Sequence, residues 1–254
     1  NTGKIDLDTV GSGKDYALTV NSEGSESFDI GDMITNNANI TLNVIDSLGA
    51  VTVDKITAGT GAVNVTLATA GTATLADAIT GKAVTIDASD VLGGTAYTGD
   101  ITASGDVTIT GNDITNNDLD GTGAGNVVLA GTAQTVTFNG GIKNDTLLID
   151  NGTGSTSVTV KGALGLGTDT LEVNYNAATV TAAYTLDVTG ITGYDTGTFT
   201  LSSAAFDATV KLGSGTDVDT IQWSGAKKAT ITGFDTTEDK LSFDGVVAGL
   251  TATA

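Results

Sequence analysis

The chain has 254 residues and a formal net charge of −20, from 30 acidic residues against 10 basic ones that are all Lys. It contains no His, Cys or Pro. The missing His and Cys exclude a Ser-His-Asp triad, a Cys nucleophile, and zinc, haem or iron–sulfur sites built on His or Cys. The missing Arg and the strong negative charge argue against nucleic acid as a partner.

The first forty residues show little periodicity and carry an acidic stretch at 23–32, which we interpret as a solvated loop. We therefore expect an irregular N-terminal segment at residues 1–40 and one continuous domain over residues 41–254. The start of the chain is polar and shows no signal peptide, so either a mature protein begins here or the chain is a fragment of a longer protein, and we expect the fragment. No apolar run approaches the roughly 18 residues that cross a bilayer, so we expect no membrane span.

From residue 40 on, short runs alternate between apolar and polar residues, as β-strands do. Clear examples lie at 63–67, 84–87, 107–110 and 230–232, and Val, Ile and Thr fill most of them. Run centres near both ends of this region lie about 10 to 12 residues apart. The pattern predicts an all-β fold: a parallel β-solenoid, similar to a β-roll, with about two short strands per turn. Tandem antiparallel β-sandwiches are the alternative.

Three segments combine glycines with Asp directly before a predicted strand, at 140–147, 165–172 and 213–221. Glycine allows positive φ in a turn, and its exposed carbonyls together with Asp carboxylates are the hard oxygen ligands that calcium prefers. An ordinary Gly-Asp turn is the other interpretation of each segment. The candidate calcium ligands are Gly141, Asp145, Gly165, Gly167, Asp169, Gly215, Asp217 and Asp219.

These segments resemble the calcium-binding nonapeptide G-G-x-G-x-D-x-U-x of the repeats-in-toxin (RTX) family, which builds a parallel β-roll. Residues 229–243 look like the segment that follows such repeats in secreted proteases and surface-layer proteins, and the resemblance covers about 138–245. It implies calcium binding and type I secretion. In that family tandem nonapeptides supply the two halves of each site, whereas the three Asp-containing turns here lie about 24 and 50 residues apart.

A further candidate calcium turn is the N-x-D-x-D-G segment that starts at Asn116 and contains Asp118 and Asp120. The twelfth position is Val127 instead of Glu, so the segment is not an EF-hand. A solvated turn rich in Asn and Asp is the alternative interpretation.

The leading functional hypothesis is a structural cell-surface protein: a self-assembling surface-layer (S-layer) subunit, extracellular and not an enzyme, with turns stabilised by calcium. Its expected partners are other copies of the chain and, through a region outside it, a cell-surface polysaccharide. The alternative is a repeat or stalk segment of a large secreted adhesin. A β-helix polysaccharide lyase or hydrolase is a third hypothesis, which would need aromatic sugar platforms, and we expect Trp223 to lie in the core instead.

Overall fold

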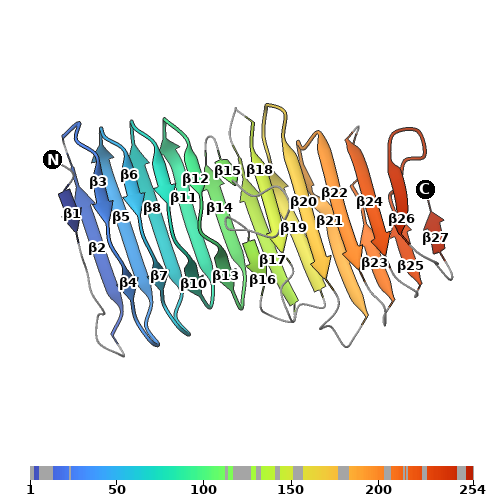
Figure 1. The fold of residues 1–254 in the computed structure, drawn as a ribbon, viewed down its shortest axis with the longest axis horizontal. Coiled ribbons are helices and arrows are strands. Elements are labelled where there is room, and N and C mark those ends of the chain that lie inside the picture. Colours follow the sequence, from blue (N-terminus) through green and yellow to red (C-terminus); the bar gives the residue numbers. More distant parts are fainter. Residues whose placement is uncertain are drawn as a thin grey trace.

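In the part of the chain that this computed structural model describes, every regular element is a β-strand. That part contains no helix that could cross a membrane. The strands stack side by side along one long axis, with β1 (Gly3–Ile5) and β27 (Leu250–Thr253) at opposite ends (Figure 1). The structure describes residues 3–5, 14–22, 24–111, 114–116, 127–129, 133–140, 144–150, 157–176, 183–202, 207–213, 215, 217–224, 228–244 and 250–253.

The strands form three parallel sheets, and the chain visits them in rotation. We call one full rotation a coil. The eleven-stranded sheet runs the whole length of the molecule. Its order is β2 (Tyr16–Asn21), β5 (Ile40–Ser47), β8 (Val63–Thr69), β11 (Val84–Val91), β14 (Val107–Gly111), β17 (Ala133–Asn139), β19 (Ser157–Ala163), β21 (Tyr184–Thr192), β23 (Ala208–Lys211), β25 (Ala229–Thr232) and β27.

The ten-stranded sheet supplies the second face of the solenoid. It consists of β4 (Met33–Ile34), β7 (Ile56–Thr57), β10 (Ile79–Gly81), β13 (Ile101–Ala103), β16 (Val127–Leu129), β18 (Thr146–Asp150), β20 (Thr170–Asn176), β22 (Thr196–Ser202), β24 (Val218–Ser224) and β26 (Lys240–Asp244). The six-stranded sheet is shorter and consists of β1, β3 (Phe28–Ile30), β6 (Val51–Val53), β9 (Ala73–Leu75), β12 (Thr95–Tyr97) and β15 (Ile114–Asn116).

The sheets divide the molecule into two parts. Up to β15 each coil contributes a strand to all three sheets, and we call residues 14–116 the three-sheet part. From β17 on, the described strands belong only to the eleven- and ten-stranded sheets, and we call residues 133–244 the two-sheet part. A coil of the three-sheet part therefore has a third face, which the described strands of the two-sheet part do not form.

The alternating sequence explains the core. In β8, Val63, Val65 and Leu67 are buried, whereas Asn64 and Thr66 between them are exposed. Each buried aliphatic side chain of this size stabilises the fold by about 1.5–3 kcal/mol. Neighbouring coils place similar residues in register, so the apolar positions form one continuous core along the axis.

The predicted fold class is confirmed: the protein is an all-β parallel solenoid, and its described strand pairs are parallel, unlike those of the antiparallel sandwich alternative. The expected two strands per coil describe the two-sheet part. The three-sheet part has three, because strands such as β4 and β7 have only two residues each and are too short to show periodicity in the sequence.

The segment at 1–40, for which the sequence suggests irregular structure, contains strands that pair within the same sheets. β2 pairs with β5, β3 with β6 and β4 with β7. Phe28 and Ile30 of β3 are buried although acidic residues surround them in sequence. The acidic side chains at 23–32 therefore do not prevent this stretch from contributing to the core.

Candidate functional site

The glycine- and Asp-containing turns of the sequence stack on one another in the two-sheet part. Thr146 pairs with Thr170, and Thr170 with Thr196, so the residues just before them lie on successive coils. Asp145 and Asp169 are 24 residues apart, and this separation is one coil. Turns that are isolated along the chain are thus neighbours in space. We call the row of Asp residues at this bend the acidic corner: Asp145, Asp169, Asp195, Asp217, Asp219 and Asp239.

Backbone hydrogen bonds connect these carboxylates from coil to coil. The N–H of Asp145 donates to Asp169 Oδ1 at 2.7 Å, and the N–H of Asp169 donates to Asp195 Oδ2 at 2.7 Å. Further along, the N–H of Asp219 donates to Asp239 Oδ1 at 3.0 Å. Each acceptor thereby binds a backbone N–H of the preceding coil, just before a strand of the ten-stranded sheet.

Three of these carboxylates are buried. Asp145 and Asp169 have no exposed surface, and Asp219 is 2% exposed. Asp169 Oδ2 and Asp219 Oδ1 have no hydrogen-bond partner in the described part of the chain. Burial of an ionised group without compensation is unfavourable. A nearby positive charge or a bound proton would therefore stabilise these two oxygens.

Burial also shifts the titration of the acidic corner. The pKa of Asp219 is raised to about 7, mainly by burial and further by the negative charges of Asp217 and Asp239. The pKa of Asp169 is raised in the same way by burial and by Asp195, against the lowering effect of the N–H bond from Asp145. The charged forms of both groups are therefore disfavoured in this environment.

Glycines make room for the carboxylates. A Cβ at Gly197 would overlap Asp219 Oδ1, and a Cβ at Gly215 would overlap Asp217 Oδ1. Gly197 faces inward on β22 in register with Asp219, so its missing side chain is what allows an acid at an interior position. The local sequence is therefore adapted to hold these carboxylates.

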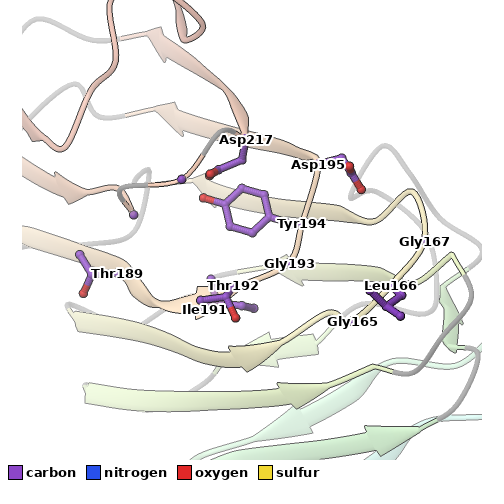
Figure 2. A pocket seen from close by; sticks show the side chains of 12 residues that line it. Gly165, Leu166, Gly167, Thr189, Ile191, Thr192, Gly193, Tyr194, Asp195 and Asp217 are labelled. Carbon is purple, nitrogen blue, oxygen red and sulfur yellow. The ribbon is translucent and has the colours of Figure 1, made fainter.

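Two hollows open along this corner and share Gly213, Gly215 and Asp217. One has a volume of about 450 Å³, and Asp217, Asp219, Asp235 and Asp239 are among its lining residues. The other, about 460 Å³, is the one drawn in Figure 2, where the Tyr194 hydroxyl points toward Asp217. Its lining includes Gly165, Gly167 and Asp195 from the two preceding coils. None of the lining residues of either hollow is basic.

The oxygen donors of these hollows are of the type that calcium prefers, which is six to eight hard oxygens from carboxylates, carbonyls and water. Their arrangement fits less closely, since no group of three acidic side chains in the described part could hold a metal ion as placed. Asp239 is already engaged, with Oδ1 accepting from the N–H of Asp219 and Oδ2 from that of Asp235 at 2.7 Å. A bound ion would therefore need Asp217 and Asp219 to turn toward it.

The structure brings most of the predicted site residues to this corner. Asp145, Asp169, Asp217 and Asp219 belong to the corner itself, and Gly165, Gly167 and Gly215 line the drawn hollow. Gly165 and Gly167 have φ of +118° and +152°, which are values that favour glycine. Asn116 instead ends β15 in the six-stranded sheet, opposite Tyr97. Three further candidates lie outside the described residues: Asp118, Asp120 and Gly141.

Sequence reasoning missed Asp195 and Asp239 as members of the row, and Tyr194 beside it. Asp195 and Asp239 lie directly before β22 and β26, each one coil after a predicted site residue, Asp169 or Asp219, and this spacing could have revealed them. Trp223 is 1% exposed and lies in the core, as predicted.

The fold and this corner define the class of the molecule: a parallel β-solenoid whose two-sheet part carries a row of partly buried carboxylates. Comparisons with protein-family models, with curated proteins and with solved structures find no match.

Proposed function

We propose that this protein is a structural component of a cell surface, an S-layer-type subunit that self-assembles outside the cell and is stabilised by calcium at the acidic corner. The observation that carries the proposal is the pair of buried, unpartnered carboxylate oxygens, Asp169 Oδ2 and Asp219 Oδ1. A divalent cation would compensate the lost hydration of each oxygen and the repulsion from the neighbouring acids, which are Asp195 beside Asp169, and Asp217 and Asp239 beside Asp219.

Asp217 and Asp219, with the backbone carbonyls of Gly213 and Gly215, would hold the ion in the 450 Å³ hollow. Asp169 and Asp195, on the two preceding coils, are a second pair of neighbouring carboxylates that could take part in binding a cation. Calcium supplies positive charge at the point where successive coils bring carboxylates together. The RTX-like turns support this assignment, because the 24-residue coil stacks them as tandem nonapeptides would be stacked.

Self-assembly follows from the same charge argument. A surface with a net charge of −20 repels its own copies, and calcium between acidic bends reduces that repulsion. A non-enzymatic role is supported by the aromatic side chains of Tyr97, Phe199 and Trp223, which are buried in the core and cannot serve as platforms for a sugar ring.

A stalk segment of a large secreted adhesin is the second candidate. The continuous stack of parallel strands along one axis favours it equally, since a stalk needs length and stiffness (Figure 1). The two candidates differ in whether copies of the chain associate with one another in calcium.

Thermal unfolding with calcium and with a chelator tests the cation site. We expect millimolar calcium to raise the melting temperature by several degrees, because a ligand that binds only the folded state stabilises it. Asp219→Asn should lose most of this shift. Asp77→Asn removes the same charge from an exposed position of the three-sheet part and should keep it. Wild-type protein that melts at the same temperature in calcium and chelator would refute the cation site.

Light scattering on the same samples tests assembly. The S-layer proposal predicts large assemblies in millimolar calcium and monomers in chelator. A protein that gains thermal stability in calcium but stays monomeric has the cation site and not the assembly, and that outcome favours the adhesin stalk.

A further inference from the structure

Tyr194 places a phenolic hydroxyl inside the acidic corner. It follows Gly193, whose φ is +79°, in the bend after β21, and it is 6% exposed. Its ring belongs to the apolar core, while its hydroxyl has no hydrogen-bond partner in the described part of the chain. A buried hydroxyl without a partner is unfavourable by itself, so the position needs an explanation.

The hydroxyl faces the carboxylates of the next coil. The register of β22 and β24 places Asp217 beside Asp195, the residue that follows Tyr194. Figure 2 shows the hydroxyl directed at Asp217. A tyrosine hydroxyl is protonated at neutral pH, so this group can donate its proton in a hydrogen bond.

The surroundings offer this hydroxyl few other acceptors and the carboxylates few other donors. The acidic groups around the two hollows are Asp195, Asp217, Asp219, Asp235 and Asp239, and no basic residue lines either hollow. Gly213 and Gly215 leave the space between the ring and the carboxylates clear; a Cβ at Gly213 would lie 4.0 Å from Tyr194 Oη.

A carboxylate that binds a cation with one oxygen still needs a donor at the other, and such outer partners fix the orientation of the ligand. The geometry points to Tyr194 as the positioning residue of the cation site: its hydroxyl donates to the Asp217–Asp219 pair and directs it toward the ion. This inference rests on the proposed calcium site and extends it to a residue outside the glycine- and Asp-containing segment at 213–221.

Calcium titration of Tyr194→Phe by isothermal calorimetry tests the inference. The variant keeps the ring in the core and removes only the hydroxyl. We expect the Kd of the tightest calcium site to rise by roughly 10- to 100-fold, the usual effect of losing an outer-shell partner. The matched control is Tyr16→Phe, which removes the hydroxyl of a partly buried tyrosine from β2, at the far end of the three-sheet part. Its tightest Kd should match that of the wild type.

Melting in chelator separates positioning from packing. A positioning role predicts that Tyr194→Phe and wild type melt at nearly the same temperature in chelator and differ in calcium. An equal loss in both conditions would mean that the hydroxyl serves only the packing of the fold, and would overturn the inference.

A readout on the wild type itself keeps the inference testable if Tyr194→Phe does not fold. Calcium that binds next to a tyrosine hydroxyl changes its near-ultraviolet absorption, so we expect a calcium-dependent difference spectrum that Tyr16→Phe retains. Wild type that binds calcium without this spectrum, or a Tyr194→Phe variant with unchanged Kd, overturns the role of Tyr194 and leaves the calcium site standing. Wild type that binds no calcium refutes the site itself.

Discussion

The two parts of the solenoid use the same local device in different environments. In the three-sheet part, Asp15 and Asn39 precede strands of the eleven-stranded sheet, and each accepts a backbone N–H of the following coil. In the two-sheet part, Asp169 and Asp195 precede strands of the ten-stranded sheet, and each accepts an N–H of the preceding coil. Both arrangements connect coils through a side-chain oxygen at a bend.

Burial is what separates the two parts. The bonds at Asp15 and Asn39 are exposed, so water solvates the remaining side-chain oxygens. All three buried acids of the described chain, Asp145, Asp169 and Asp219, lie in the two-sheet part. At the surface, such a side chain only completes a turn, because water solvates its remaining oxygens. In the interior, the same carboxylate loses its hydration, so it is unfavourable unless a ligand or a proton compensates its charge.

We expect the largest effect on stability when a buried acid is introduced into the core of the three-sheet part. Ile86 of β11 is fully buried in the three-sheet part, with neither a glycine gap nor an N–H donor prepared for an acid. Ile86→Asp should lower the free energy of unfolding by about 4–5 kcal/mol, since it leaves an uncompensated buried charge. Urea unfolding followed by circular dichroism measures the loss.

The control for this substitution is Thr85→Asp, on the exposed face of the same strand, which should change stability by less than about 1 kcal/mol. Equal losses for the two variants would mean that the three-sheet core accommodates an acid as readily as the acidic corner does, and the comparison would fail.

The next effect is a pH dependence confined to the two-sheet part. Because the pKa of Asp219 is about 7 when folded and near its ordinary value of 3.8 when unfolded, the folded state retains a proton that the unfolded state releases between about pH 4 and 7. In chelator, stability should therefore fall as pH rises through this window, by at most roughly 4 kcal/mol, and then level off. Asp169 acts in the same direction.

Urea midpoints of wild type and Asp219→Asn, measured from pH 4.5 to 8 in chelator, isolate the contribution of Asp219 from the general repulsion of the acidic surface. The difference between the two proteins should change steadily up to about pH 7. Asp187 does not interfere in this window, because hydrogen bonds from Thr189 and the ion pair with Lys211 lower its pKa, and its contribution is lost only at more acidic pH. A difference that does not vary with pH would contradict the assignment.

A smaller effect is expected from filling the gap beside the buried acid. Gly197→Ala places a methyl group against Asp219 Oδ1 and the ring of Phe199, so we expect a loss of about 1–3 kcal/mol, the usual effect of overpacking a core. Gly24→Ala, at a bend of the three-sheet part with open space around it, should be neutral within about 0.5 kcal/mol. If Gly197→Ala is as harmless as Gly24→Ala, the gap is not what admits Asp219 to the interior.

The sequence predicted the solenoid because alternation and an even spacing of strands are local properties. It did not reveal the third sheet, since strands such as Ile56–Thr57 are too short for a period of two to be visible. The sequence indicated the glycines near the acidic corner and four of its Asp residues. It did not indicate that these residues stack on one another, because the stacking depends on the length of a coil. That length is set by the register of distant strands, which no single motif shows. Tyr194 was missed for the same reason, because its role depends on what the following coil places beside it.

The smallest effect tests the exposed side of the comparison. Asn39→Ala removes the acceptor of the Ala62 N–H, a bond of 2.8 Å at the surface, so water can replace it and the loss should be about 1 kcal/mol. Asn64→Ala, on the exposed face of β8, should have a still smaller effect. The informative result is the response to calcium: because Asn39 lies in the three-sheet part, its substitution should lower the melting temperature equally in calcium and in chelator. If calcium abolishes the loss, a cation binds at this bend too. The exposed bends of the three-sheet part would then bind calcium, which we assign to the buried acidic corner alone.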